Sequence, residues 1–149
     1  MSKEIIEEIK SLGKISDISI DDYTISIYAK IDFYTKENIC IIFDDFDINE
    51  SREQQFIIDN MDFILHNIGM IRENVCNSII KYISKEYDKK ITIETFEKLE
   101  IELVNIFFSP DEFFGDCRIR FHSNFEIEHG LGVLLERWKV MEVGWADIR

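Results

Sequence analysis

The feature that most constrains the fold is a long stretch of helical periodicity in the middle of the chain. Apolar residues recur there every three or four positions, at Ile57, Met61, Ile64, Ile68, Ile71, Val75, Ile79 and Tyr82. This spacing places them on one face of a helix. A helix over residues 51–87 would be roughly 50 Å long, because each residue adds about 1.5 Å. We therefore expect a bend or break, and Gly69 is the position that favours one.

Two helix ends are indicated by capping residues. Ser51 and Gln54 have the spacing of a capping box, so we predict that the long helix begins at Ser51. A shorter amphipathic helix is predicted over residues 3–12, and Gly13 is expected to end it.

Alternating apolar and polar residues predict strands on both sides of the long helix. Residues 23–33 and 39–43 form a hairpin, and a short strand at residues 17–20 is expected to pair with it. After the helix, strands are expected to end near residue 108 and to cover residues 119–121, 131–136 and 139–143. Arg118 and Arg120 are expected to pair across strands with Glu100 and Glu102. The sequence thus predicts one α+β domain over residues 1–149, with an N-terminal β-hairpin, a long central helix and a C-terminal antiparallel β-meander.

Charge and hydropathy limit the classes of function. The chain carries 30 acidic and 17 basic residues, a net charge of −13. Such a field repels phosphate backbones and anionic lipid, so we expect neither nucleic acid nor a membrane as a partner. No apolar stretch has the length of a membrane helix, and acids occupy the first residues, where a signal peptide would be apolar. We expect a cytoplasmic protein. Cys40, Cys76 and Cys117 lack metal or redox spacing and are expected to be buried, reduced thiols.

The densest acidic cluster follows the hairpin and contains Asp44, Asp45, Asp47 and Glu50. It partly matches the spacing of an EF-hand loop. Glu50 stands at the position of the required glycine and Phe56 at that of the bidentate glutamate, so calcium binding is not expected. Acids before a helix are also favoured by its dipole. We predict that Asp44, Asp45, Asp47 and Glu50 form an edge that binds a basic protein partner.

A second candidate site is the group of Glu126, Glu128 and His129, which are residue types that bind zinc. In an extended segment the two glutamates share one face and His129 points to the other, so this spacing disfavours a metal site. We expect no metal and no cofactor.

The same tail resembles a known family. Phe125, Glu126, Ile127, Glu128, His129, Gly130, Leu131, Gly132 and Val133 precede a hairpin, and Val143, Gly144, Trp145, Ala146, Asp147 and Ile148 follow it. This pattern is similar to that of a family of small uncharacterised bacterial domains. In that family a tryptophan usually occupies the place of Phe125, and Asp-Gly the place of the Arg137-Trp138-Lys139 turn. Since the family's activity is unknown, the resemblance implies no catalytic residue.

A structural role accounts for this motif without any chemistry. Glycines at strand ends fix backbone geometry, and His129 can bond a nearby carbonyl or Asp147. We therefore predict a sheet-closing motif made of Glu128, His129, Gly130, Gly132, Gly144 and Asp147.

The resemblance also implies a role by association, since domains of this kind are often encoded beside polymorphic toxins. The expected function is an immunity-type inhibitor that binds a toxin or effector and occludes its surface. The acidic field of this chain suits a basic toxin domain as the partner. The alternatives are a small metal-dependent enzyme that uses Glu126, Glu128 and His129, or a structural domain that forms oligomers. The oligomeric state is left open.

Overall fold

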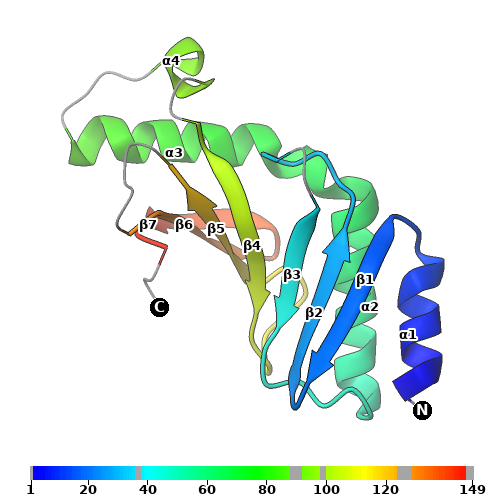
Figure 1. The fold of residues 1–149 in the computed structure, drawn as a ribbon. Helices are drawn as coiled ribbons and strands as arrows, with labels where there is room; N and C mark the ends of the chain where they lie inside the picture. Colours follow the sequence, from blue (N-terminus) through cyan, green and yellow to red (C-terminus); the bar gives the residue numbers. More distant parts are fainter. Residues whose placement is uncertain (1, 36–37, 88–91, 98–99, 124–128, 147–149) are drawn as a thin grey trace.

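The strands of the computed structural model form one seven-stranded sheet (Figure 1). The structure describes residues 2–35, 38–87, 92–97, 100–123 and 129–146. The elements in chain order are α1 (Ser2–Ser11), β1 (Ile15–Asp21), β2 (Thr24–Ala29), β3 (Ile39–Phe43), α2 (Ser51–Asn67), the 3-10 helix η1 (Ile68–Ile71), α3 (Arg72–Glu86), α4 (Ile93–Glu97), β4 (Glu102–Phe108), β5 (Cys117–His122), β6 (Leu131–Glu136) and β7 (Lys139–Gly144). The predicted α+β fold is confirmed.

The order of the strands in the sheet follows their order in the chain, from β1 to β7. Each neighbouring pair is antiparallel except β3 and β4, which run parallel. A parallel pair needs a long crossover connection, and α2, η1, α3 and α4 supply it. The β-hairpin and the β-meander predicted from the sequence are therefore two parts of one sheet.

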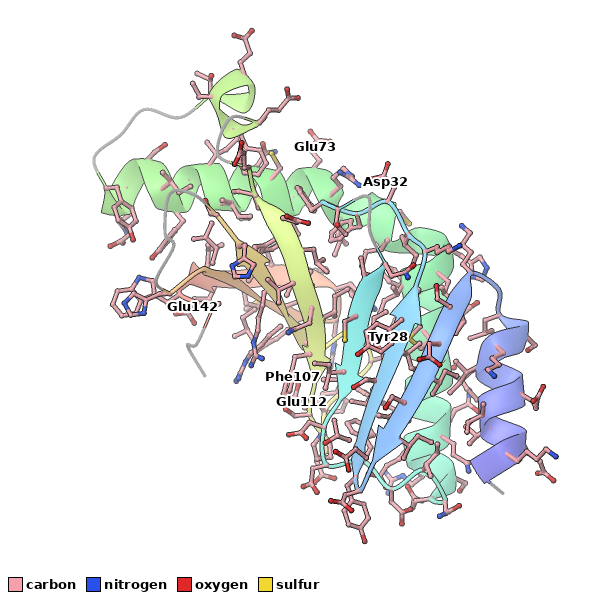
Figure 2. All side chains as sticks on the ribbon, viewed as in Figure 1. Tyr28, Asp32, Glu73, Phe107, Glu112 and Glu142 are labelled. Atoms are coloured by element: carbon pink, nitrogen blue, oxygen red, sulfur yellow. The ribbon has the colours of Figure 1, made fainter. Side chains whose placement is uncertain are left out.

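One face of the sheet packs against the long helices. The buried cluster combines apolar strand residues with the inward faces of α2 and α3, including Ile25, Ile27, Ile41, Ile106, Ile119 and Val133 from strands and Ile57, Met61, Ile64, Val75, Ile79 and Ile83 from helices. Figure 1 shows α2 behind β1 to β3 and α3 crossing behind the upper end of β4. The opposite face carries Tyr28 and Phe107, and no described helix covers them in Figure 2.

The long helix breaks where the sequence predicts. Residues Ile68–Ile71 form a single 3-10 turn around Gly69, and α3 continues from Arg72. The helix α2 begins at Ser51, as predicted, but its N-cap is Glu50 and not Ser51. Glu50 has extended backbone, and its carboxylate accepts hydrogen bonds from the Arg52 and Glu53 amides at 3.2 and 3.0 Å. A carboxylate is a stronger acceptor than the Ser51 hydroxyl at the positive end of a helix dipole.

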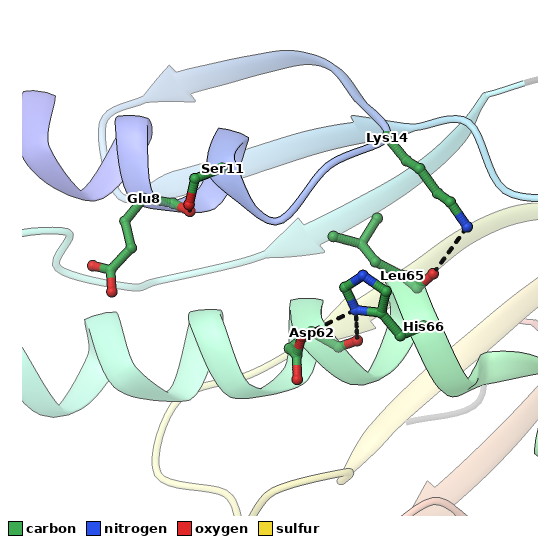
Figure 3. A network of polar contacts seen from close by, with 6 residues as sticks. All are labelled: Glu8, Ser11, Lys14, Asp62, Leu65 and His66. Atoms are coloured by element: carbon green, nitrogen blue, oxygen red, sulfur yellow. Dashed lines mark hydrogen bonds and ion pairs between the residues drawn. The ribbon is translucent and has the colours of Figure 1, made fainter.

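Polar contacts gather at the C-terminal end of α2, and one of them comes from the connection between α1 and β1 (Figure 3). The Lys14 ammonium donates a 3.5 Å hydrogen bond to the Leu65 carbonyl, in the last turn of α2, where cations are favoured. His66, one residue later, contacts the Asp62 carboxylate at 3.0 Å, one turn earlier in the same helix. These contacts occupy groups at the C-terminal end of α2 just before the break.

The expected pairing of Arg118 and Arg120 with Glu100 and Glu102 is wrong. Arg120 lies opposite Asn105 and Arg118 opposite Phe107, while Glu102 pairs with His122. An irregularity between Leu103 and Asn105 shifts the register, as a β-bulge does. The Arg120 guanidinium instead lies 4.5 Å from the centre of the Phe107 ring.

The described part of the chain contains no helix that is long and apolar enough to cross a membrane. The cysteines are free; Cys117 is buried, whereas Cys40 and Cys76 are only half-buried.

A buried asparagine ties α2 to the connection between β4 and β5. Asn60 is fully buried, its side-chain amide donates to the Phe56 carbonyl at 2.8 Å, and its Oδ1 accepts from the Gly115 amide at 2.9 Å. The Gly115 carbonyl in turn accepts a 3.0 Å hydrogen bond from the Trp138 amide. The β4–β5 connection is thereby held between α2 and the turn that joins β6 to β7.

Asn60→Ala should lower the free energy of unfolding by about 1–3 kcal/mol, because the Gly115 amide would stay buried without an acceptor. Urea denaturation measures this change. The matched control is Asn74→Ala on the exposed side of α3, which should stay within about 0.5 kcal/mol of the parent protein. Equal losses in the two variants would contradict the role of Asn60.

Candidate acidic groove

The candidate site lies where two segments leave the sheet at the same edge. Residues 44–50 follow the carboxyl end of β3, and residues 109–114 follow the carboxyl end of β4. Because β3 and β4 are parallel, the two segments emerge side by side. Between them and the first turns of α2 lies a groove of about 690 Å³, here called the acidic groove.

The lining of the acidic groove combines negative charge with aromatic surface. Six carboxylates line it, from Asp45, Glu50, Glu53, Asp59, Asp111 and Glu112, together with four phenyl rings, from Phe46, Phe56, Phe113 and Phe114. Arg52 is the cation among the lining residues. Phe113 and Phe114 are 68% and 46% exposed, which is unusual for adjacent phenylalanines.

The four acids predicted to bind a partner take different positions. Asp45 and Glu50 line the groove, although Glu50 also caps α2. Asp44 accepts a 2.8 Å hydrogen bond from the Thr24 hydroxyl, and Asp47 accepts one of 2.9 Å from the Asn49 amide. The carboxylates of Asp44 and Asp47 therefore hold the turn after β3, and neither residue is among those that line the groove.

Sequence reasoning missed the second wall of the groove, residues 110–114. The signal that could have found it is the turn-forming run Ser109-Pro110-Asp111-Glu112, which is followed directly by Phe113 and Phe114. A turn that carries two adjacent large apolar residues is a candidate contact surface. The pairing of β3 with β4, which brings this turn to the acids after β3, has no local signal in the sequence.

The Asp116 carboxylate is one of the groups that hold the second wall in place. Asp116 accepts hydrogen bonds from the Phe113 amide at 3.0 Å and from the Arg137 amide at 2.9 Å. The Arg137 guanidinium lies 5.5 Å from the centre of the Phe113 ring, and the Phe114 ring meets Phe63 edge-on at 6.1 Å. With the Asn60 contact to Gly115, these bonds fix the backbone that presents the two exposed rings.

Partial desolvation and neighbouring charge act together on Glu112, although this residue is exposed at the surface. Desolvation raises the pKa of its carboxyl, and the negative charges of Asp116 and Glu136 raise it further, against a smaller lowering by Arg118. The native protein therefore holds a proton on Glu112 more tightly than the unfolded chain does.

Glu112→Gln should raise the melting temperature at neutral pH. Since the native pKa lies above its ordinary value of 4.5, the parent protein loses stability as the pH rises from that value through the native pKa. The gain from Glu112→Gln should grow through this window, stay constant above it, and vanish in more acidic solution.

Thermal unfolding measured from acidic to neutral pH checks this expectation, with Glu86→Gln at the exposed end of α3 as the matched control. A melting temperature that Glu112→Gln lowers at neutral pH would show that the carboxylate stabilises the fold.

The described part of the tail motif lies at the other end of the meander. The His129 ring stacks on Trp145 with centroids 3.9 Å apart, and the His129 carbonyl accepts a 3.1 Å hydrogen bond from the Ala146 amide. Gly144 is paired with Gly132 across β6 and β7. Glu126, Glu128 and Asp147 lie outside the described residues. The structural role of the motif stays a prediction.

Gly132 lies where a second chain segment passes very close. A Cβ at Gly132 would be 2.8 Å from the Trp145 carbonyl oxygen and 3.0 Å from the Ala146 Cα. Gly130 has a φ of +65°, and a Cβ there would be 2.7 Å from the Phe121 carbonyl oxygen. The two glycines therefore let the segment after β7 fold back over the start of β6.

Gly132→Ala should cost about 1–3 kcal/mol of unfolding free energy, because the backbone at Trp145 must move. Gly69→Ala is the matched control, since a Cβ at Gly69 meets nothing within 4 Å. Urea denaturation of both variants measures the difference. Full stability in Gly132→Ala would show that this close approach is not needed by the fold.

The described residues do not form a metal-binding site. No group of three or more His, Cys, Asp or Glu side chains there could hold a metal ion. The acids of the expected edge are used as turn and cap acceptors or line an open groove, and His66 pairs with Asp62.

Comparison with known protein families gives a match over most of the chain. Neither the curated proteins nor the solved structures contain a significant match to this chain. The family model described as Domain of unknown function (DUF6985) matches residues 14–149, which is nearly the whole chain. The chain therefore belongs to this family of domains of unknown function.

Proposed function

We propose that the protein is a binding module that inhibits a toxin or effector by covering its functional surface, as immunity-type proteins do. The observation that carries the proposal is the acidic groove, which is lined by six carboxylates together with two exposed phenylalanine rings. The partner is a basic protein, and the groove takes one of its cationic segments.

Charge supports a basic partner. The lining of the groove has one cation against six acids, in a chain whose net charge is −13. Field lines concentrate in a cleft lined by one sign of charge, which speeds the encounter with an oppositely charged surface. The same field repels acidic competitors, so it contributes selectivity as well as rate.

The aromatic part of the groove supports a protein partner over a free cation. Buried aromatic residues supply most of the binding energy at protein interfaces, whereas exposed ion pairs add little. The Asn60 and Asp116 hydrogen bonds already fix the turn that carries Phe113 and Phe114. Little conformational entropy is then lost when a partner covers these rings.

The decisive test in cells is co-expression with the protein encoded by the neighbouring gene. If that protein is lethal, the parent chain should restore growth, and Asp59→Lys combined with Glu112→Lys should abolish the protection. The matched control, Glu86→Lys combined with Glu94→Lys, changes the net charge equally at the opposite edge of the structure and should still protect. A neighbour without toxicity, or equal loss in both double variants, would contradict the proposal.

In solution, fluorescence anisotropy with a labelled peptide that alternates lysine and leucine tests the groove itself. The Asp59→Lys and Glu112→Lys pair should weaken binding about tenfold or more, which corresponds to about 1.4 kcal/mol. Phe113→Ser combined with Phe114→Ser should weaken binding of this peptide but leave a lysine–serine peptide unaffected, because only leucine needs the rings. Equal effects on both peptides would show that the two rings do not contribute to binding.

A further inference from the structure

A second hollow lies at the other end of the parallel strand pair. It has a volume of about 330 Å³ and is lined by Tyr34, Arg72, Cys76, Phe96, Glu97, Glu100 and Ile101, a set here called the α4 pocket. Tyr34 lies on the connection that leads into β3, and Glu100 and Ile101 lead into β4. Arg72 and Cys76 come from the first turns of α3, and Phe96 and Glu97 from α4.

The floor of the α4 pocket is aromatic. Phe96 is 7% exposed and meets the Tyr34 ring edge-on at 6.4 Å, which anchors the short helix α4. The Tyr34 ring in turn meets Phe121 edge-on at 5.4 Å, and its hydroxyl donates a 2.8 Å hydrogen bond to the Arg72 carbonyl. Burial raises the pKa of the Tyr34 hydroxyl well above its usual range, so this group is a neutral donor. The rings therefore form a fixed apolar surface.

The rim of the pocket carries both signs of charge. The Arg72 guanidinium lies 4.9 Å from the centre of the Tyr34 ring. Its Nη2 donates a 2.6 Å hydrogen bond to the Asp32 carbonyl and lies 3.9 Å from the exposed Asp32 carboxylate, which leaves its other N–H groups for a ligand. A guanidinium has five N–H donors, so Arg72 can still bind a carboxylate in bidentate form. Glu97 and Glu100 add two exposed carboxylates to the same lining.

The backbone around the pocket is held in an uncommon conformation at two places. Tyr34 has a φ of +59° and Glu100 a φ of +51°, in the left-handed region that bulky side chains avoid. The Tyr34 carbonyl accepts a 3.1 Å hydrogen bond from the Leu103 amide, which joins the two segments that enter β3 and β4. Such conformations persist only where surrounding contacts impose them, and ligand sites are one place where they concentrate.

We propose that the α4 pocket binds a free α-amino acid with an apolar side chain. Arg72 binds its carboxylate, Glu97 and Glu100 bind its ammonium group, and Tyr34, Phe96 and Ile101 surround its side chain. A volume near the lower end of known ligand pockets, about 300–1,000 Å³, suits a molecule of this size. The ligand needs both a carboxylate and an ammonium group. A ligand with only the carboxylate would be repelled by Glu97 and Glu100, and a ligand with only the ammonium group would be repelled by Arg72. This site is independent of the acidic groove and of the function proposed for it.

Cys76 provides a direct measurement, because its thiol lines the pocket. Burial raises the pKa of this thiol, so alkylation by a maleimide should be slow and should respond to anything that covers the pocket. The experiment uses the full chain with Cys40→Ser, and mass spectrometry follows the Cys76 peptide. Millimolar L-leucine or L-phenylalanine should slow the alkylation several-fold and raise the melting temperature.

Two analogues test the assigned chemistry. Leucinamide lacks the carboxylate and N-acetyl-leucine lacks the ammonium group, so both should protect Cys76 much less than leucine does. Arg72→Gln should abolish protection by leucine, whereas Glu73→Gln, whose side chain is exposed on the next residue of α3 and is not part of the lining, should retain it. If Arg72→Gln fails to fold, Glu97→Gln combined with Glu100→Gln should give the same loss.

The proposal is overturned if neither amino acid protects Cys76 or shifts the melting temperature, or if an analogue protects as well as leucine. Protection by the lysine–leucine peptide in place of the free amino acids would assign the pocket to a side chain of a protein partner, and would also overturn it. None of these results depends on the acidic groove, since the groove is tested by variants of Asp59, Glu112, Phe113 and Phe114.

Discussion

The parallel ladder between β3 and β4 is the contact on which the rest of the structure depends. Four residue pairs form it, from Cys40 opposite Asn105 to Phe43 opposite Phe108. The last pair stacks its rings at 4.6 Å with an interplanar angle of 9°. The ladder is the place where an N-terminal group of three strands meets a C-terminal group of four. Without it the chain would have two small sheets, each with an unpaired edge.

The break in the central helix follows from the shape of this sheet. Neighbouring strands in a sheet rotate by about 20–25° on average, so the direction of the face changes across seven strands. In this chain α2 lies behind β1 to β3, whereas α3 contacts β7 at the opposite edge. One straight helix could not keep its apolar stripe against both groups of strands. The 3-10 turn at Ile68–Ile71 lets the crossover change direction where Gly69 and the exposed Met70 pack against little.

Local patterns in the sequence were sufficient for most elements. Period-two alternation identified the strands, and the spacing of three or four identified α2 and α3 together with the break between them. A tertiary contact overrides a local preference at the turn between β6 and β7. Trp138 is buried, has a φ of +65°, and stacks on Phe63 at 4.2 Å in a two-residue turn where glycine or asparagine is usual. The pairing expected for Arg118 and Arg120 was wrong because the local pattern of a strand does not fix its register. Glu102 lies opposite His122, so the two arginines lie opposite Phe107 and Asn105.

Only one wall of the acidic groove could be predicted from the sequence, because tertiary contacts determine the rest. The acids after β3 are visible as a cluster in the sequence, but only the fold separates those that stabilise backbone from those that face the groove. Asp44 and Asp47 accept hydrogen bonds within the turn, whereas Asp45 lines the groove. The second wall, with Phe113 and Phe114, required the β3–β4 pairing, which joins residues more than 60 positions apart in the chain.

Parallel pairing also explains why the two hollows lie at opposite ends of the sheet. The segments that leave β3 and β4 meet at one edge and form the acidic groove, and the segments that enter the same two strands meet at the other edge and form the α4 pocket. In open sheets with parallel strands, ligands are usually bound at the carboxyl ends, where successive connections diverge. The acidic groove has that position. The α4 pocket does not, and it exists because the Leu103 amide bonds the Tyr34 carbonyl and Phe96 anchors α4 on the Tyr34 ring. The one ladder therefore creates an open charged groove at one edge, and a small hollow whose walls depend on two specific contacts at the other.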